Sequence, residues 1–179
     1  ALPAGDYWYA HFVRYHTTLE VTPDEVHEIG LREVARLRGE LSRLQPALGV
    51  GGDARAVFDV MRADPKFHAA SPSALLAGYE LLRTRVDAQM PTLFLRQPEA
   101  KFVIRPVEAH RAAAAASASY QQPSADGSRP GVFYVNTHDL ASRPTYMMEP
   151  VFLHEAIPGH HFQVAIAQET PNLPSFRRF

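Results

Sequence analysis

The chain has 179 residues, of which 46% are apolar and 21% charged, with a net charge of −1 and no cysteine. This composition is typical of a globular chain with a buried core, and the absence of a basic excess argues against nucleic acid or an anionic membrane surface as a partner. Disulfides, thiolate ligands and a cysteine nucleophile are excluded, so a metal site would need His, Asp or Glu, and no apolar run approaches the ~18 residues of a membrane span.

Three helices are predicted in the first half of the chain. The sequence from Thr22 to Glu25 indicates a helix start, because threonine can cap, proline suits the first position and glutamate completes a capping box. Apolar residues then recur at helical spacing, and we expect Pro46 and the glycines after it to end this helix. A short helix over residues 53–62 and a longer one over residues 71–90 follow.

The periodicity changes in the second half. Residues 101–107 and 131–137 are predicted to be short strands. Between them, the alanine run 112–116 is predicted to be helix or loop, and residues 122–130 have the composition of a loop. A last helix is predicted from about residue 144 to about residue 169. The pattern therefore predicts a mainly α fold with a small β-sheet (α+β).

A cluster of histidines lies on this last predicted helix. Nine histidines occur in the chain, and three of them fall between His154 and His161, beside Glu155. Catalytic zinc takes imidazole nitrogens and keeps one position open for water, whose proton a neighbouring carboxylate can accept. In the HExxH pattern both histidines lie four residues apart on one helical face. Here the fourth position after His154 is Pro158, which cannot bind a metal.

The spacing of the histidines requires a distorted helix if they share one ion. On a straight helix His160 would lie ~9 Å along the axis from His154 and roughly 120° off its face, and His161 ~10.5 Å along it. A Pro-Gly pair supplies a reason for a kink or π-bulge. We therefore expect a bulge or break at Ile157–Gly159 that brings His160 beside His154, with His161 as the alternate ligand. The alternative is a helix whose histidines are partly buried and satisfied by hydrogen bonds.

Several stretches resemble the large bacterial family known as domain of unknown function 885, which is grouped with the gluzincin-like metallopeptidases. The stretches are residues 19–31, residues 129–137, Arg143-Pro144 and residues 154–163. The resemblance implies a zincin or gluzincin-like helical architecture. It also implies one zinc ion, with His154 and His160 as metal ligands and Glu155 as the general base.

The resemblance further implies that the chain is truncated. Family members are several times longer, and residues 174–179 look like the start of a further helix that should bring a glutamate ligand. We expect one partial domain over residues 1–179, helical over 1–98 and carrying the strands and the metal-site helix over 99–179. The missing C-terminal part of the polypeptide is then an expected partner, as is a second copy through an exposed apolar face. Without the third ligand, zinc would bind weakly.

Other residues are candidates for substrate contacts. A strand edge near the metal of a zinc peptidase often holds an extended peptide, so Tyr134 and Asn136 are predicted to bind substrate, with packing as the alternative for Tyr134. Arg143 is predicted to hold a substrate carboxylate, although an exposed arginine near a helix start would look the same. Gln163 is predicted to hydrogen-bond to a metal-binding side chain and so to orient it. Tyr120 offers a hydroxyl for an oxyanion, or packs.

The sequence thus predicts a zinc-dependent hydrolase acting on peptide or small amide substrates. The sequence contains neither a phosphate-binding glycine loop nor a Gly-x-Ser-x-Gly elbow, so it indicates neither nucleotide hydrolysis nor a serine hydrolase. The alternative is a non-catalytic helical module, or an inactive fragment, with structural histidines. A bacterial, exported protein is favoured over a cytoplasmic one on the resemblance.

Overall fold

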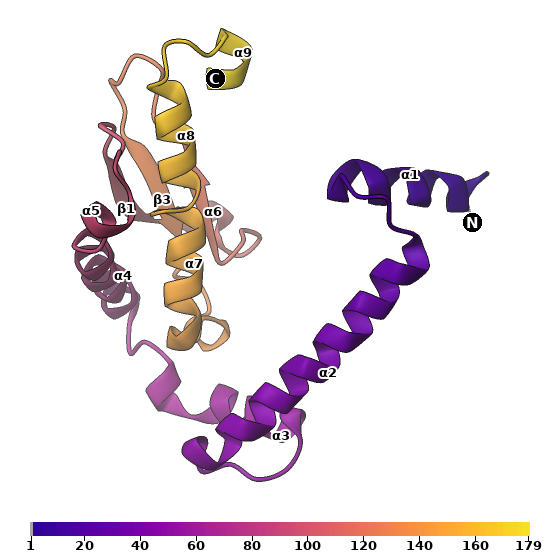
Figure 1. The fold of residues 1–179 in the computed structure, drawn as a ribbon. Coiled ribbons are helices and arrows are strands. Elements are labelled where there is room, and N and C mark those ends of the chain that lie inside the picture. The colour runs from indigo at the N-terminus through magenta and orange to yellow at the C-terminus, as the bar shows by residue number, and fades with distance from the viewer. Residues whose placement is uncertain (1) are drawn as a thin grey trace. The chain divides into compact units, whose positions relative to one another are not determined.

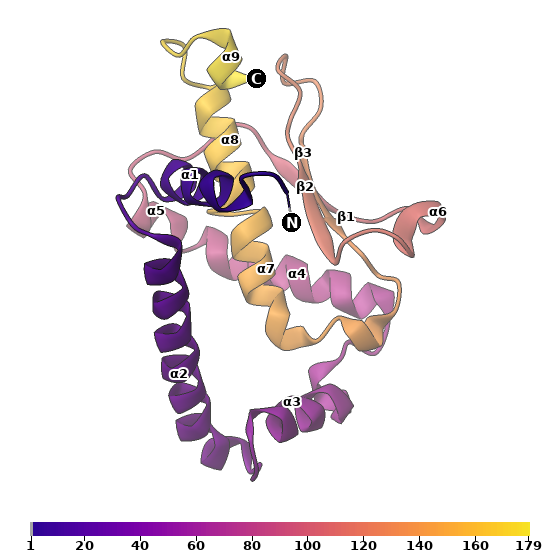
Figure 2. The same ribbon diagram turned by 90° about the vertical axis from the view of Figure 1, so that its right-hand side faces the viewer.

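The computed structural model describes residues 2–179 (Figures 1 and 2). The chain divides into two compact units, one ending at Met61 and one from Arg62 to Phe179. Each unit is described by itself. The expectation of one partial domain remains a prediction, while the mainly helical composition with a small sheet is confirmed.

The first unit consists of helices. Helix α1 (Gly5–Thr17) was not predicted, and α2 (Pro23–Leu48) begins with the predicted capping box. The Thr22 hydroxyl accepts the Glu25 N–H at 3.2 Å, and the Glu25 carboxylate accepts the Thr22 N–H at 2.7 Å. Pro46 lies inside the last turn rather than ending the helix, which continues to a left-handed cap at Gly49 with φ +67. Proline removes one backbone donor there, and the helix ends two residues beyond it.

Helix α3 (Ala54–Ala63) matches the short helix predicted at this place. The carboxylate of Asp53 accepts the N–H of Ala56 at 2.9 Å, which satisfies a backbone donor at the helix start. The groove between α2 and α3 is lined mainly by apolar side chains, and no residue of α2 is buried. The apolar face of this unit is therefore open in the described chain.

The second unit contains a three-stranded mixed sheet. The two predicted strands are confirmed as β1 (Phe102–Pro106) and β3 (Gly131–Val135), and β2 (Ala118–Gln121) was not predicted. The strand order is β1-β3-β2, with β1 parallel and β2 antiparallel to β3. Strand β3 is thus the middle strand, and β1 and β2 are the two edges of the sheet.

Short and long helices complete the second unit around the sheet (Figure 2). They are α4 (Pro72–Asp87), α5 (Met90–Leu93), α6 (Ala109–Ala112), α7 (Met148–Glu155), α8 (His160–Gln168), α9 (Ser175–Arg178) and 3-10 turns at Pro65–Phe67, Leu140–Ser142 and Thr145–Met147. None of the helices described over residues 2–179 is both long enough and apolar enough to cross a membrane.

The core of this unit lies where α4 and α7 meet the sheet. Phe133 of β3 and Phe152 of α7 are fully buried, with ring centroids 5.7 Å apart. Tyr79 of α4 contacts Phe133 edge-on at 5.1 Å. Edge-to-face aromatic pairs add to the burial of their large apolar surfaces. This packing holds α7, whose C-terminal end carries His154 and Glu155, against the sheet.

Candidate metal site

The last predicted helix is broken in the structure. Helix α7 ends at Glu155 and α8 begins at His160, and both figures show α8 following α7 in the same general direction (Figures 1 and 2). The single helix over residues 144–169 is therefore wrong, while the expected break at Ile157–Gly159 is confirmed. The N–H of His161 reaches the carbonyl of Ala156, five residues back, at 3.1 Å. This widened turn replaces the α-helical hydrogen bonds that a proline cannot make.

Gly159 allows the two helices to approach each other closely at the break. A Cβ atom at this position would lie 1.8 Å from the carbonyl oxygen of His154 and 2.5 Å from that of Leu153. Both values are far below any van der Waals separation, so only glycine fits. The first turn of α8 consequently lies directly on the last turn of α7.

The break brings His154, Glu155 and His160 together. The ring centroids of His154 and His160 are 4.7 Å apart with their planes at 84°, and the Glu155 Oε2 lies 4.0 Å from His160 Nε2. One ligand atom from each of the three residues lies within 4.8 Å of the other two. The side chain of His160 is 45% exposed and that of Glu155 19%. Two imidazoles and a carboxylate form a candidate metal-binding group, because these donor types bind divalent metal ions.

His161 has a different environment from its neighbour. It is 2% exposed, its Nε2 donates to the Ala100 carbonyl at 3.1 Å, and its Nδ1 lies 2.9 Å from the Tyr120 hydroxyl. A carbonyl only accepts, so Nε2 carries the proton and Nδ1 accepts from the tyrosine. Burial lowers the pKa of His161 and raises that of Tyr120 to about 12, which keeps both groups neutral. Both ring nitrogens of His161 are therefore occupied, and His161 is not part of the three-residue group.

Comparison with known proteins identifies the family of the chain. All of its residues, 1–179, match the family model described as bacterial protein of unknown function (DUF885). The chain belongs to this DUF885 family. The resemblance of the sequence to that family is thereby confirmed.

A solved structure resembles this DUF885 chain closely. It is the crystal structure of a protein from Colwellia psychrerythraea described as a putative lipoprotein, with 29% identity and a TM-score of 0.91. The match covers 99% of this chain and 31% of that chain, so the chain spans about a third of its solved relative. A comparison with curated proteins found no match.

Asn136 has the surroundings of a structural residue. It is fully buried, and its amide nitrogen donates to the carbonyls of Ala112, Ala115 and Ala116 at 2.7 to 3.1 Å. Its side-chain oxygen accepts the N–H of His138 at 3.0 Å. These bonds hold the turn after α6 against the end of β3. A contact of Asn136 with substrate remains a prediction.

Tyr134 projects from the middle strand of the sheet. It is partly buried, its hydroxyl donates to Gln121 at 3.4 Å, and the Arg111 guanidinium lies 4.8 Å above its ring. The main chain of β3 pairs with a strand on each side, so it cannot also bind an extended peptide. The expectation that this strand offers an edge is wrong, because β1 and β2 take the edges. The role of the Tyr134 side chain remains a prediction.

Arg143 and Gln163 also lie outside the three-residue group. The Arg143 Nε donates to the carbonyl of Asn136 at 3.2 Å and its Nη1 to Ser142 at 3.0 Å, and the residue lines a hollow of about 190 Å³ with Tyr79. Gln163 is exposed on α8, one turn after His160. Within residues 2–179, neither Arg143 nor Gln163 makes a hydrogen bond or an ion pair with His154, Glu155 or His160. Their predicted roles stay untested.

Tyr120 lies beside the site, and the sequence did not indicate this position. Its ring stacks beside that of His160, with centroids 6.4 Å apart and planes at 18°, while its hydroxyl bonds to His161. It lies on β2, the strand that was not predicted. A tyrosine at the end of an alanine-rich run carries no local signal of this position.

We expect Gly159→Ala to lower the free energy of unfolding by about 1–3 kcal/mol or more, because the new methyl group collides with backbone and not with a flexible side chain. Gly39→Ala is the matched control, since nothing lies within 4 Å of a Cβ there and α2 continues through it. Alanine at that position should be stabilising by up to about 1 kcal/mol. Urea denaturation followed by circular dichroism measures both, and equal stability of the two variants would contradict the close approach.

We expect Asn136→Ala to destabilise the fold by about 2–4 kcal/mol, because it leaves buried carbonyls without a donor. Gln121→Ala removes only a long, exposed hydrogen bond to Tyr134 and should change stability by less than about 0.5 kcal/mol. Thermal denaturation distinguishes them. If Asn136 served substrate alone, its alanine variant would be as stable as the control.

Proposed function

We propose that this chain carries the histidine and glutamate part of a zinc-dependent hydrolase site that cleaves peptide or related amide bonds. The proposal is supported chiefly by the convergence of His154, Glu155 and His160 within 4.8 Å at the helix break. His154 and His160 would hold the ion, with His160 preferred over the fully engaged His161. The grouping of the family with gluzincin-like peptidases supports the same assignment and a zincin-like architecture.

Glu155 is proposed to act as the general base. It follows His154 directly, and successive residues of a helix diverge by about 100°, so its carboxylate approaches the group from the side. Zinc, when bound, lowers the pKa of a bound water to about 7 and polarises a substrate carbonyl. The Glu155 carboxylate would accept the proton of the attacking water and pass it to the leaving amine.

The proposed substrate is an extended peptide at an edge of the sheet. Strand β2 is the favoured edge, because its Tyr120 lies beside His160, whereas β3 is paired on both sides. Tyr134, Asn136 and Arg143 remain proposed contacts to the substrate, and Gln163 a proposed support of the ligands. A third ligand would be a glutamate from a part of the longer polypeptide outside these residues.

An exported location is also proposed. The family is bacterial, and the similar protein from Colwellia psychrerythraea is described as a putative lipoprotein. A lipoprotein is a protein attached to a membrane by a lipid, so the relative's description points to export. Export is thus indicated for the relative, and we propose it for this chain because the two are similar.

We expect the full-length protein to hold one zinc ion, measured by elemental analysis, and Glu155→Gln to keep that ion while losing activity by about 10²–10⁴-fold. Cleavage of a fluorescence-quenched peptide library measures the activity. Glu149→Gln is the control on the same helix, because Glu149 pairs with Arg85 on the surface. A well-folded protein without zinc, or a Glu155→Gln variant as active as the control, would favour a non-catalytic helical module.

We further propose that the rest of the longer polypeptide covers the apolar groove between α2 and α3. The groove is lined by Val34, Leu37, Leu41, Leu44 and Phe58, and Leu37 is 55% exposed. The match covers only 31% of the solved relative, so about two-thirds of that longer chain is available to cover this surface.

We expect a cysteine at Leu37 to be protected from a thiol reagent in the full-length protein. Peptide mass spectrometry reads the labelling at this position, since residues 1–179 contain no other cysteine. Arg32→Cys is the control, since 100° per residue places it on the far side of α2. Equal labelling rates at the two positions would contradict the proposal. Protection that disappears on dilution would instead indicate a homo-oligomer.

A further inference from the structure

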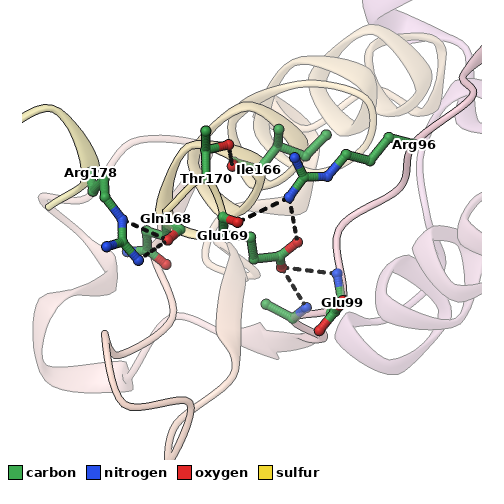
Figure 3. Close-up of polar contacts among 8 residues, drawn as sticks. Arg96, Glu99, Ile166, Gln168, Glu169, Thr170 and Arg178 are labelled. Atoms are coloured by element: carbon green, nitrogen blue, oxygen red, sulfur yellow. Dashed lines mark hydrogen bonds and ion pairs between the residues drawn. The ribbon is translucent and has the colours of Figure 1, made fainter. Parts of the chain in front are cut away.

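Both ends of α8 are hydrogen-bonded to the same segment before β1. At the start of the helix, the His161 Nε2 donates to the Ala100 carbonyl at 3.1 Å. At its end, the Glu169 Oε1 accepts the N–H groups of Glu99 and Ala100, each at 2.9 Å (Figure 3). The Ala100 residue is therefore held through its N–H by one end of α8 and through its C=O by the other.

This segment leads directly into the sheet. Phe102 begins β1 two residues later, and its ring lies 4.8 Å from the ring of His161. On the other side of His161, Tyr120 of β2 donates its hydroxyl to Nδ1 at 2.9 Å. His161 thus contacts both edge strands of the sheet or the segment before them. These bonds, together with the buried Phe162 and Ala165, hold α8 against the sheet.

The same bonds contribute to the position of His160. His160 immediately precedes His161, and within residues 2–179 its exposed ring makes no hydrogen bond. His154 is placed by α7, which the buried ring of Phe152 anchors in the core, and α8 adds Phe162 to the same core. The separation of the two candidate ligands therefore depends on how α8 is held.

We propose that His161 and Glu169 are positioning residues that hold α8 so that His160 stays beside His154. This inference rests on the proposed function, in which His154 and His160 hold a metal. Some residues do not touch the metal but orient the side chains that bind it. Removal of such a residue changes metal affinity by about 10–100-fold. Loss of either bond to Ala100 would let α8 shift and would separate the two rings.

The two oxygens of Glu169 differ in a way that gives a sharp test. Oε1 accepts both backbone N–H groups, whereas Oε2 is buried without a hydrogen bond and lies 3.8 Å from the Arg96 guanidinium (Figure 3). A glutamine at position 169 keeps an oxygen acceptor for the two N–H groups, and an alanine does not. We call the bonds of His161 and Glu169 to the segment before β1 the clamp. The Glu169→Gln variant should keep the clamp, and the Glu169→Ala variant should lose the Glu169 part of it.

The test uses the full-length protein and cobalt(II) ions as the probe. Cobalt affinity is measured by competition with a chelator, the ligand geometry by the visible absorption of bound cobalt, and folding by circular dichroism. We expect Glu169→Ala and His161→Leu to weaken cobalt binding by about 10–100-fold and to alter the absorption bands. Glu169→Gln should bind as the wild type does. So should Thr170→Ala, since the Thr170 hydroxyl donates back to the Ile166 carbonyl of α8 at 2.7 Å and, among residues 2–179, makes no bond to the segment before β1.

Folded Glu169→Ala and His161→Leu variants with wild-type affinity and absorption would overturn the proposal, as would a Glu169→Gln variant as weak as the alanine variant. Should the alanine and leucine variants fail to fold, Tyr120→Phe removes only the bond to His161. It is expected to weaken cobalt binding in the same direction, and no change would count against the clamp.

A wild-type protein that binds no cobalt would refute the proposed metal function and not the clamp. The clamp would then be judged from crystal structures of the metal-free variants. We expect the separation of the His154 and His160 rings to stay near 4.7 Å in Glu169→Gln and to increase in Glu169→Ala. An unchanged separation in both variants would refute the clamp by itself.

Discussion

The close approach of α8 to the carbonyl of His154 is the constraint on which the candidate site depends. The approach is tolerated only because Gly159 has no side chain, since a Cβ there would lie 1.8 Å from that oxygen. The preceding proline removes a backbone donor, and the turn widens so that an N–H reaches five residues back. A spacing of six residues, which separates two side chains on a straight helix, thereby becomes a contact between His154 and His160.

Two adjacent histidines have opposite tasks in this arrangement. His160 is exposed and has no hydrogen bond recorded in the described chain, so its ring nitrogens are available to a metal. His161 is buried and both of its nitrogens are engaged, so it belongs to the support of the helix. Successive side chains of a helix point about 100° apart, which lets one face solvent while the next faces the sheet. In the proposed site, His160 is a ligand and His161 supports the helix that carries it.

The sequence predicted the features that depend on neighbouring residues. The capping box before α2 and the break after α7 follow from Thr22, Glu25, Pro158 and Gly159, whose effects act within one helical turn. Two of three strands were recognised because they are rich in β-branched and aromatic residues. Strand β2 was missed, since its Ala-Ser-Tyr-Gln sequence is short and contains no β-branched residue.

The remaining features depend on contacts between distant parts of the chain. The partner of His161 is a backbone carbonyl at Ala100, and a backbone group leaves no mark in the sequence. The middle place of β3 follows from a pairing with the missed strand, so the expectation of a free edge there was wrong. The burial of Asn136 likewise depends on a turn twenty or more residues earlier. Local patterns therefore located the candidate site but not what holds it.

The central claim is that the helix break makes His154 and His160 joint ligands of one metal ion. Anomalous diffraction at the zinc absorption edge, from crystals of the full-length protein with zinc, tests this claim most directly. We expect a single strong peak at about 2.0–2.1 Å from one ring nitrogen of each of these histidines. A peak bound to only one of the two, or to neither, would contradict it.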